Sequence, residues 1–247
     1  LKELAASIEE VADLPDGPLA VALSGGADSA ALLWYCRRVD RPVRAIHVHH
    51  GLPASDRLAD AAASISAALE VDLSVENVEL GEGPSAENQA RIVRYAALDR
   101  QVGPGEWILT GHTSDDQAET VLMHLLRASG LDGLKGIPAR RHPFARPFLR
   151  VSGATTREVA TLAGLEWIVD PVNLEPDPLR NQIRQHLLPL LEGYNPRLRR
   201  ALATTARLAA TDLDYLDSLV EVPIEVRTDR VAVPASGRDR VRRRRAR

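Results

Sequence analysis

The sequence is poor in cysteine and in aromatic residues, and both shortages limit what the chain can be. Cys36 is the one cysteine among 247 residues, so the chain forms no intrachain disulfide and no zinc site built from several cysteines. Such sparse cysteine usage fits a reducing compartment, and we expect a cytoplasmic protein. Aromatic residues make up 4% of a chain that is 45% hydrophobic, so leucine, valine, isoleucine and alanine must fill most of the core.

The sequence also lacks long apolar runs. None approaches the roughly 20 residues that a membrane-spanning helix needs. The segment Leu1–Ala6 lacks the basic region and extended apolar core of a secretory signal, so we expect no membrane partner. The length suits one large domain, or a domain of typical size with a small second one.

Charge is distributed unevenly along the chain. The net charge is −3, yet residues 238–247 hold seven arginines and one aspartate, so the rest of the chain is acidic. The arginine run could bind RNA, or it could be a disordered end. Any RNA-binding surface elsewhere must be a local basic patch on an acidic body.

Apolar segments of strand length alternate with segments of helical periodicity. This alternation predicts an α/β fold with a doubly wound parallel sheet. We expect the nucleotide-binding domain over residues 1–191 and a small helical C-terminal appendage over residues 192–247, after a proline-rich linker at 170–179. Strands are predicted at about residues 19–23, 43–48, 71–80, 107–110 and 144–149. Helices are predicted at about 3–13, 28–38, 55–69, 85–102, 155–163, 180–191 and 196–219, and another begins at Ser114.

Three polar residues are expected to cap these helices. Ser85 and Ser114 stand where two predicted helices begin, and serine is a preferred N-cap. Thr155 and Glu158 have the spacing of a capping box for a third helix.

A glycine turn between the first strand and the first long helix of the predicted sheet is the most informative segment. Its residues are Ser24, Gly25, Gly26, Ala27, Asp28 and Ser29. Such a turn brings backbone N–H groups and a helix N-terminus to one place, which suits a phosphate group. The carboxylate of Asp28 would repel phosphate unless a divalent cation lies between them, so Asp28 is a candidate metal ligand. The alternative is an ordinary helix start capped by Ser24 or Asp28.

Two common phosphate-binding patterns are missing. No glycine is followed at the required spacing by Gly-Lys-Ser or Gly-Lys-Thr, and no complete Gly-x-Gly-x-x-Gly pattern is present. Ligands of doubly wound sheets bind beyond the carboxyl ends of the strands. The loops after strands one, two and four should therefore form one site, which brings His50, Gly111 and His112 to the glycine turn.

Acidic and basic pairs at helical spacing complete the set of candidate residues. Asp116 and Glu119 are three residues apart and share a helix face, where they could hold a metal ion or an ammonium group. Alternatively they form a favourable acidic first turn. The arginines of two further pairs also share a helix face and suit phosphate or RNA, or else surface ion pairs; they are Arg91 with Arg94, and Arg180 with Arg184.

Together these segments resemble the tRNA(Ile)-lysidine synthase family within the PP-loop ATP pyrophosphatases. The resemblance extends over about residues 19–196, and its most specific parts are Gly111–Thr120 and Arg180–Arg184. It implies a ligase that uses ATP and Mg²⁺ to adenylate the wobble cytidine of an isoleucine tRNA with a CAU anticodon. The ε-amine of free L-lysine then displaces AMP. A homodimer is compatible with this resemblance.

The resemblance also implies residue roles. Ser24–Ser29, His50, Gly111 and His112 would bind ATP. Asp28 would organise the metal or the pyrophosphate, and Asp116 and Glu119 would hold the lysine ammonium group or take its proton. Catalytic roles at phosphate or base are implied for Arg91 and for Arg180 or Arg184.

Two departures from the family pattern stand out, namely Pro53 after His-Gly-Leu and Gly153 where arginine is common. Alternatives are a tRNA thiolase, although many of those use paired cysteines, and another adenylating PP-loop synthetase. A non-catalytic nucleotide-binding or RNA-binding module is the alternative from a different class.

Overall fold

The computed structural model describes residues 1–51, 55–79, 86–169, 178–219, 225–227 and 230–232. Several sequence predictions therefore lie outside the described residues. They are the residue Pro53, the Ser85 cap, most of the linker at 170–179 and the arginine-rich end at 238–247.

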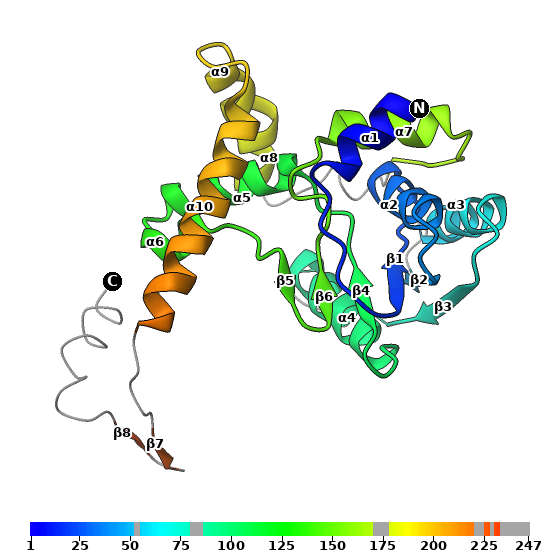
Figure 1. The fold of residues 1–247 in the computed structure, drawn as a ribbon, viewed down its shortest axis with the longest axis horizontal. Coiled ribbons are helices and arrows are strands. Elements are labelled where there is room, and N and C mark those ends of the chain that lie inside the picture. Colours follow the sequence, from blue (N-terminus) through cyan, green and yellow to red (C-terminus); the bar gives the residue numbers. More distant parts are fainter. Residues whose placement is uncertain (52–54, 80–85, 170–177, 220–224, 228–229, 233–247) are drawn as a thin grey trace.

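A six-stranded sheet forms the centre of the described structure, in the order β3-β2-β1-β4-β6-β5 (Figure 1). The neighbouring pairs from β3 to β6 are parallel, and only β5 runs antiparallel, at the edge. This arrangement confirms the predicted doubly wound α/β fold. The strands are β1 (Leu19–Ala22), β2 (Val43–His49), β3 (Leu73–Asn77), β4 (Trp107–Leu109), β5 (Arg140–Arg141) and β6 (Phe144–Ala145).

Helices cover both faces of the sheet. Successive residues of β1 are buried on opposite faces, because side chains alternate along a strand and both faces carry helices. Leu19 and Val21 belong to one apolar cluster, and Ala20 belongs to another with Leu98 of α4 (Ala86–Arg100). The first cluster is covered by helices α1 (Lys2–Glu9), α2 (Ala27–Arg38), α3 (Ser55–Ala68) and α7 (Gly153–Leu162).

A second group of helices lies beside the sheet. The apolar side chains of Ala118, Leu122, Ile183 and Leu188 form its core. Within this group α10 runs along α5 and α6 (Figure 1). The elements are α5 (Ser114–Leu126), α6 (Gly130–Leu134), α8 (Pro178–Gln182), a π-helical turn (Ile183–Leu187), α9 (Leu188–Glu192) and α10 (Leu198–Ser218).

The C-terminal region, predicted to be helical, also contains a short antiparallel hairpin of β7 (Glu225–Arg227) and β8 (Arg230–Ala232). No helix in the described ranges is both long and apolar enough to span a bilayer.

Two predicted caps are wrong, because a residue one or three positions earlier in the sequence caps each helix. Thr113, not Ser114, is the N-cap of α5, and its backbone N–H and hydroxyl both donate to the Asp116 carboxylate. Ser152, not Thr155, is the N-cap of α7, and its hydroxyl oxygen accepts the N–H of Thr155 at 3.1 Å.

The last predicted strand is also shorter than expected. Strand β6 ends at Ala145, and a turn begins at Pro147, whose missing N–H cannot continue a ladder.

Candidate active site

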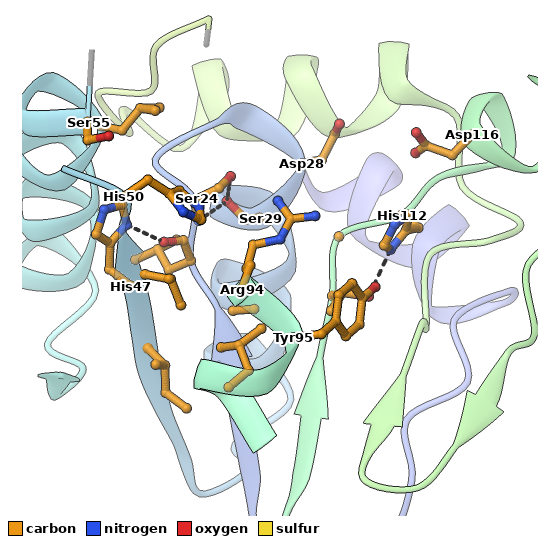
Figure 2. A pocket seen from close by; sticks show the side chains of 18 residues that line it. Ser24, Asp28, Ser29, His47, His50, Ser55, Arg94, Tyr95, His112 and Asp116 are labelled. Atoms are coloured by element: carbon orange, nitrogen blue, oxygen red, sulfur yellow. Dashed lines mark hydrogen bonds between the residues drawn. The ribbon is translucent and has the colours of Figure 1, made fainter. Parts of the chain in front are cut away.

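A cavity opens at the carboxyl ends of β1, β2 and β4 (Figure 2). The loops that follow these three strands meet there, as the sequence predicts for a doubly wound sheet. Of the predicted site residues, the cavity is lined by Ser24, Asp28, Ser29, His50, Gly111, His112 and Asp116.

Hydrogen bonds of its own serine hydroxyl groups stabilise the conformation of the Ser24–Ser29 loop. Ser29 Oγ accepts the N–H of Ser24 at 3.1 Å and donates to the carbonyl of Gly26 at 3.0 Å. Gly25 has φ +85°, and a Cβ there would lie 2.5 Å from the carbonyl oxygen of Leu58 on α3. Both the positive φ and the lack of space for a Cβ require glycine at position 25. The first-turn N–H groups of α2 remain available for an anion.

Gly111 brings the loop after β4 against the start of α2. A Cβ at Gly111 would lie 3.0 Å from both the carbonyl carbon of Asp28 and the nitrogen of Ser29. A side chain there would push β4 away from the glycine loop. The close approach explains why this strand end carries a glycine.

Asp28 is a half-buried carboxylate that lines the cavity. The pKa of Asp28 is raised to about 6, chiefly by burial; the hydrogen bond from Thr156 opposes the rise, and the nearby charge of Asp116 adds to it. The hydroxyl of Thr156 donates to Oδ1 of Asp28. A cation beside Asp28 would compensate the cost of its negative charge.

The two carboxylate oxygens of Asp116 have different partners. Oδ2 accepts the backbone N–H of Thr113 at 2.8 Å, and Oδ1 lies 3.5 Å from Nη2 of Arg180. The Asp116 carboxylate is therefore fixed by its own helix end and turned toward the cavity (Figure 2).

Glu119 lies one turn further along α5 and is held between two arginines. Its side chain is 1% exposed, and it accepts from Arg180 Nε at 2.9 Å. Arg184 donates two further hydrogen bonds to Glu119, from Nε to Oε1 at 2.6 Å and from Nη2 to Oε2 at 3.0 Å. Both oxygens of Glu119 are thus engaged, and neither Glu119 nor these two arginines lines the cavity.

Two cavity histidines sit in environments that disfavour a positive charge. Burial lowers the pKa of His112 well below its usual value, and the charges of Arg146 and Arg94 lower it further. Its Nδ1 is 2.8 Å from Thr110 Oγ1. Burial also lowers the pKa of His47, whose Nδ1 donates to the carbonyl of Leu23 at 2.8 Å. Both shifts favour the neutral form of the ring.

The two arginines of α4 differ in position. Arg94 lines the cavity, whereas Arg91 is exposed, with its guanidinium 5.0 Å from the ring centroid of Tyr95. Figure 2 shows Arg94 and Tyr95 pointing from α4 toward the cavity. The spacing of the two arginines in the sequence predicts that they share a helix face. It does not predict which of the two reaches the cavity.

Thr156, Ser55 and Tyr95 are site residues that the sequence reasoning missed. Ser55 and Tyr95 line the cavity, and Thr156 contacts Asp28 from α7. Ser55 and Thr156 belong to no recognisable short pattern, and Tyr95 directly follows the Arg91 and Arg94 pair without having been picked out as a site residue. Among the described residues no three histidine, cysteine, aspartate or glutamate side chains form a metal-ligand cluster.

Comparisons with known proteins identify the family to which the chain is similar. Residues 1–191 match the family model of the PP-loop domain. A tRNA(Ile)-lysidine synthase from Pseudomonas putida is 38% identical over 211 residues, which cover 81% of this chain and 49% of the relative. Another from Salinispora tropica is 40% identical over 228 residues, which cover 86% of this chain and 68% of the relative. The chain thus spans about half the length of the Pseudomonas relative.

A solved structure shows the same fold at low identity. The U34-tRNA thiolase NcsA from Methanococcus maripaludis superposes with a TM-score of 0.66 at 17% identity, covering 85% of this chain and 78% of its own. On the family match and on the identity to relatives of which it spans two thirds, this chain belongs to the tRNA(Ile)-lysidine synthase family of PP-loop proteins.

Proposed function

We propose that this chain uses ATP to activate the wobble cytidine of an isoleucine tRNA with a CAU anticodon and joins free lysine to it. The products are lysidine at that position, AMP and pyrophosphate. The observation that carries the proposal is the meeting of the glycine loop and the acidic start of α5 in one cavity. Relatives that bear the name tRNA(Ile)-lysidine synthase support it. We expect the reaction in the cytoplasm, where ATP, lysine and tRNA are available.

The glycine loop suits the triphosphate of ATP. Ser24 and the N-terminus of α2 offer hydrogen-bond donors at one end of the cavity, and Gly111 keeps β4 close behind them. Preorganised donors of this kind stabilise charge that develops as the bond between the α and β phosphates breaks. Arg94 lines the same cavity and adds a positive charge for the phosphates.

The carboxylates present fit Mg²⁺. Asp28 and Asp116 both line the cavity, and the charge of Asp116 contributes to the raised pKa of Asp28. Mg²⁺ can bind through a single carboxylate together with substrate phosphates, so Asp28 would hold it and Asp116 is left for the lysine amine. When bound, the ion would neutralise charge on the departing pyrophosphate.

Two displacements make up the proposed reaction. The C2 carbonyl oxygen of cytidine attacks the α-phosphorus of ATP, and pyrophosphate leaves. The ε-amine of lysine then attacks C2, loses a proton, and AMP leaves with the oxygen. Adenylation turns a poor leaving group into a good one, which divides one difficult substitution into two easier steps.

Asp116 is the residue we assign to the lysine amine. Asp116 lines the cavity, and its Oδ1 has only a long contact of 3.5 Å with Arg180, so this carboxylate can bind an ammonium group or accept its proton. Glu119 is assigned to hold Arg180 and Arg184, because both of its oxygens are already bound by them. The anticodon loop is single-stranded, so its cytidine can enter such a cavity without opening a duplex.

The properties of Cys36 argue against sulfur transfer. Its side chain is fully buried, and burial raises the pKa of its thiol to about 12. A thiol of this kind is not ionised at pH 7 and cannot carry sulfur as a nucleophile.

AMP release tests the proposal with three alternative donors: lysine, ammonia and sulfide, each with and without isoleucine tRNA. We expect AMP release only when ATP, tRNA and lysine are all present, because the lysine amine displaces AMP from the adenylated cytidine. AMP formation with ammonia in the absence of tRNA would instead indicate a small-molecule synthetase. No AMP under any condition would contradict the proposal for this chain.

A further inference from the structure

The first turn of α7 contacts the glycine-loop helix through one hydroxyl group. Thr156 is fully buried, and its Oγ1 donates a hydrogen bond to Oδ1 of Asp28. The two residues are 128 positions apart in the sequence. Helices α2 and α7 pack against each other beside the sheet (Figure 1), so this contact lies inside the domain.

The start of α7 is fixed on its other side by α5. The N–H of Gly153 donates to Oδ2 of Asp115 at 2.9 Å, and the N–H of Ser114 donates to the carbonyl of Val151 at 2.8 Å. A Cβ at Gly153 would lie 2.6 Å from that same Asp115 oxygen, so a side chain there would displace the Asp115 carboxylate. Thr156 is thereby held at a set position relative to α5, the helix that carries Asp116.

The hydroxyl of Thr156 has one proton and two nearby acceptors. One is Oδ1 of Asp28, and the other is the carbonyl oxygen of Gly153 at 3.0 Å. An ionised carboxylate is the stronger acceptor, so the proton goes to Asp28. Among the described residues, Thr156 is the one side chain recorded as donating a hydrogen bond to this carboxylate. Oδ2 of Asp28 is then left for the cavity.

We propose that Thr156 is a positioning residue for the reaction, because its hydroxyl holds the Asp28 carboxylate with one oxygen facing the nucleotide site. The inference rests on the proposed function, since Thr156 acts only through Asp28. A hydroxyl at this position fixes a side chain that would otherwise rotate about two bonds. Holding a charged ligand in place before the substrate arrives lowers the cost of organising the site during the reaction.

Three substitutions at Thr156 and one control substitution at the preceding residue separate this role from a packing role. Thr156→Val keeps the shape and removes the hydroxyl, Thr156→Ala removes hydroxyl and bulk, and Thr156→Ser keeps the donor. Thr155→Val is the control, because the hydroxyl of Thr155 pairs with Ser152 and not with Asp28. Thermal melting of the full chain verifies that each variant folds.

Two measurements are made on the folded variants. The first is binding of Mn²⁺, by electron paramagnetic resonance, in the presence of a non-hydrolysable ATP analogue. The second is the separation of kcat from the KM for ATP in AMP release. Loss of a hydrogen bond to a charged group should weaken Mn²⁺ binding and lower kcat by about tenfold in the valine and alanine variants. We expect the KM for ATP to change little, and the serine and control variants to match the wild type.

Several results would overturn the inference. Valine and alanine variants that bind Mn²⁺ and turn over like the serine variant would show that the hydroxyl is dispensable. Tighter Mn²⁺ binding by the valine variant would show that Thr156 holds Asp28 away from the site. Wild-type protein that binds no ATP analogue would overturn the proposed function itself, and only that result removes both claims together.

Discussion

Glu119 and Arg184 form a two-point ion pair, with Nε 2.6 Å from Oε1 and Nη2 3.0 Å from Oε2. Glu119 belongs to α5, which begins at the cavity, and Arg184 belongs to the π-helical turn 65 residues later. The pair therefore attaches the C-terminal helices to the helix that carries Asp116. Such a contact makes Glu119 a structural partner of the arginines.

We predict that Glu119→Ala destabilises the fold. The carboxylate is 1% exposed, and its removal takes away the ion pairs that Arg180 and Arg184 make with Glu119, which should lower the free energy of unfolding by about 2–3 kcal/mol. Urea unfolding measures the change, and Glu158→Ala, at an exposed position on α7, should have no effect. If Glu119→Ala were inactive but as stable as the wild type, Glu119 would have a direct catalytic role.

The raised pKa of Asp28 predicts that Asp28→Asn stabilises the ligand-free protein above pH 6. Between pH 4 and 6 the folded protein keeps a proton that the unfolded chain has released, so stability declines as pH rises through that window. Asparagine has no charge to bury, and we expect a gain of about 2 kcal/mol at pH 7 that shrinks toward pH 4.

Thermal melts of both proteins from pH 4 to 8 measure this dependence. The control is Asp60→Asn, at an exposed position on α3, which should melt like the wild type at every pH. An Asp28→Asn protein that is less stable than the wild type at pH 7 would show that the buried charge is already compensated in the free protein.

The two adjacent glycines of the loop should respond differently to alanine. Gly25 has φ +85° and no room for a Cβ, so Gly25→Ala should cost roughly 2 kcal/mol of stability and prevent nucleotide binding. Gly26 has φ −90°, and the nearest atom to an added Cβ is 3.5 Å away, so Gly26→Ala should fold normally. Chemical denaturation compares the two, and equal stability would contradict the loop geometry.

Arg94 and Arg91 should differ in their effect on the chemical step. Arg94 lines the cavity, and Arg94→Ala should lower the rate of AMP formation by roughly a hundredfold. Arg91 is exposed over Tyr95, and Arg91→Ala should instead raise the KM for tRNA with a smaller change in kcat. Steady-state kinetics with varied tRNA separate the two, and a larger loss of kcat in Arg91→Ala would reverse the assignment.

The sequence was sufficient to predict the sheet and the place of the cavity. Buried strands such as Leu19–Ala22 are apolar on both faces, and the glycine turn after that strand marks the site. Both signals are local in sequence. The helix caps were misplaced by one to three residues, because serine and threonine occupy several neighbouring positions and only the backbone angles decide which one caps.

Contacts between distant segments could not be predicted from the sequence. The Glu119–Arg184 pair and the Thr156–Asp28 hydrogen bond join residues 65 and 128 positions apart. Acidic and basic pairs at helical spacing reveal a shared face, but they do not reveal what that face meets. The spacing of Asp116 and Glu119 therefore predicted that Glu119 could bind substrate. In the fold Glu119 instead forms ion pairs with Arg180 and Arg184.

Incorporation of labelled lysine into tRNA tests the central claim most directly. The full chain is incubated with ATP, labelled lysine and total tRNA, beside an Asp28→Ala variant. We predict label in an isoleucine tRNA that depends on ATP, and a rate at least roughly a hundredfold lower in the variant. RNA that stays unlabelled with wild-type protein, or label that enters equally with Asp28→Ala, would contradict the account.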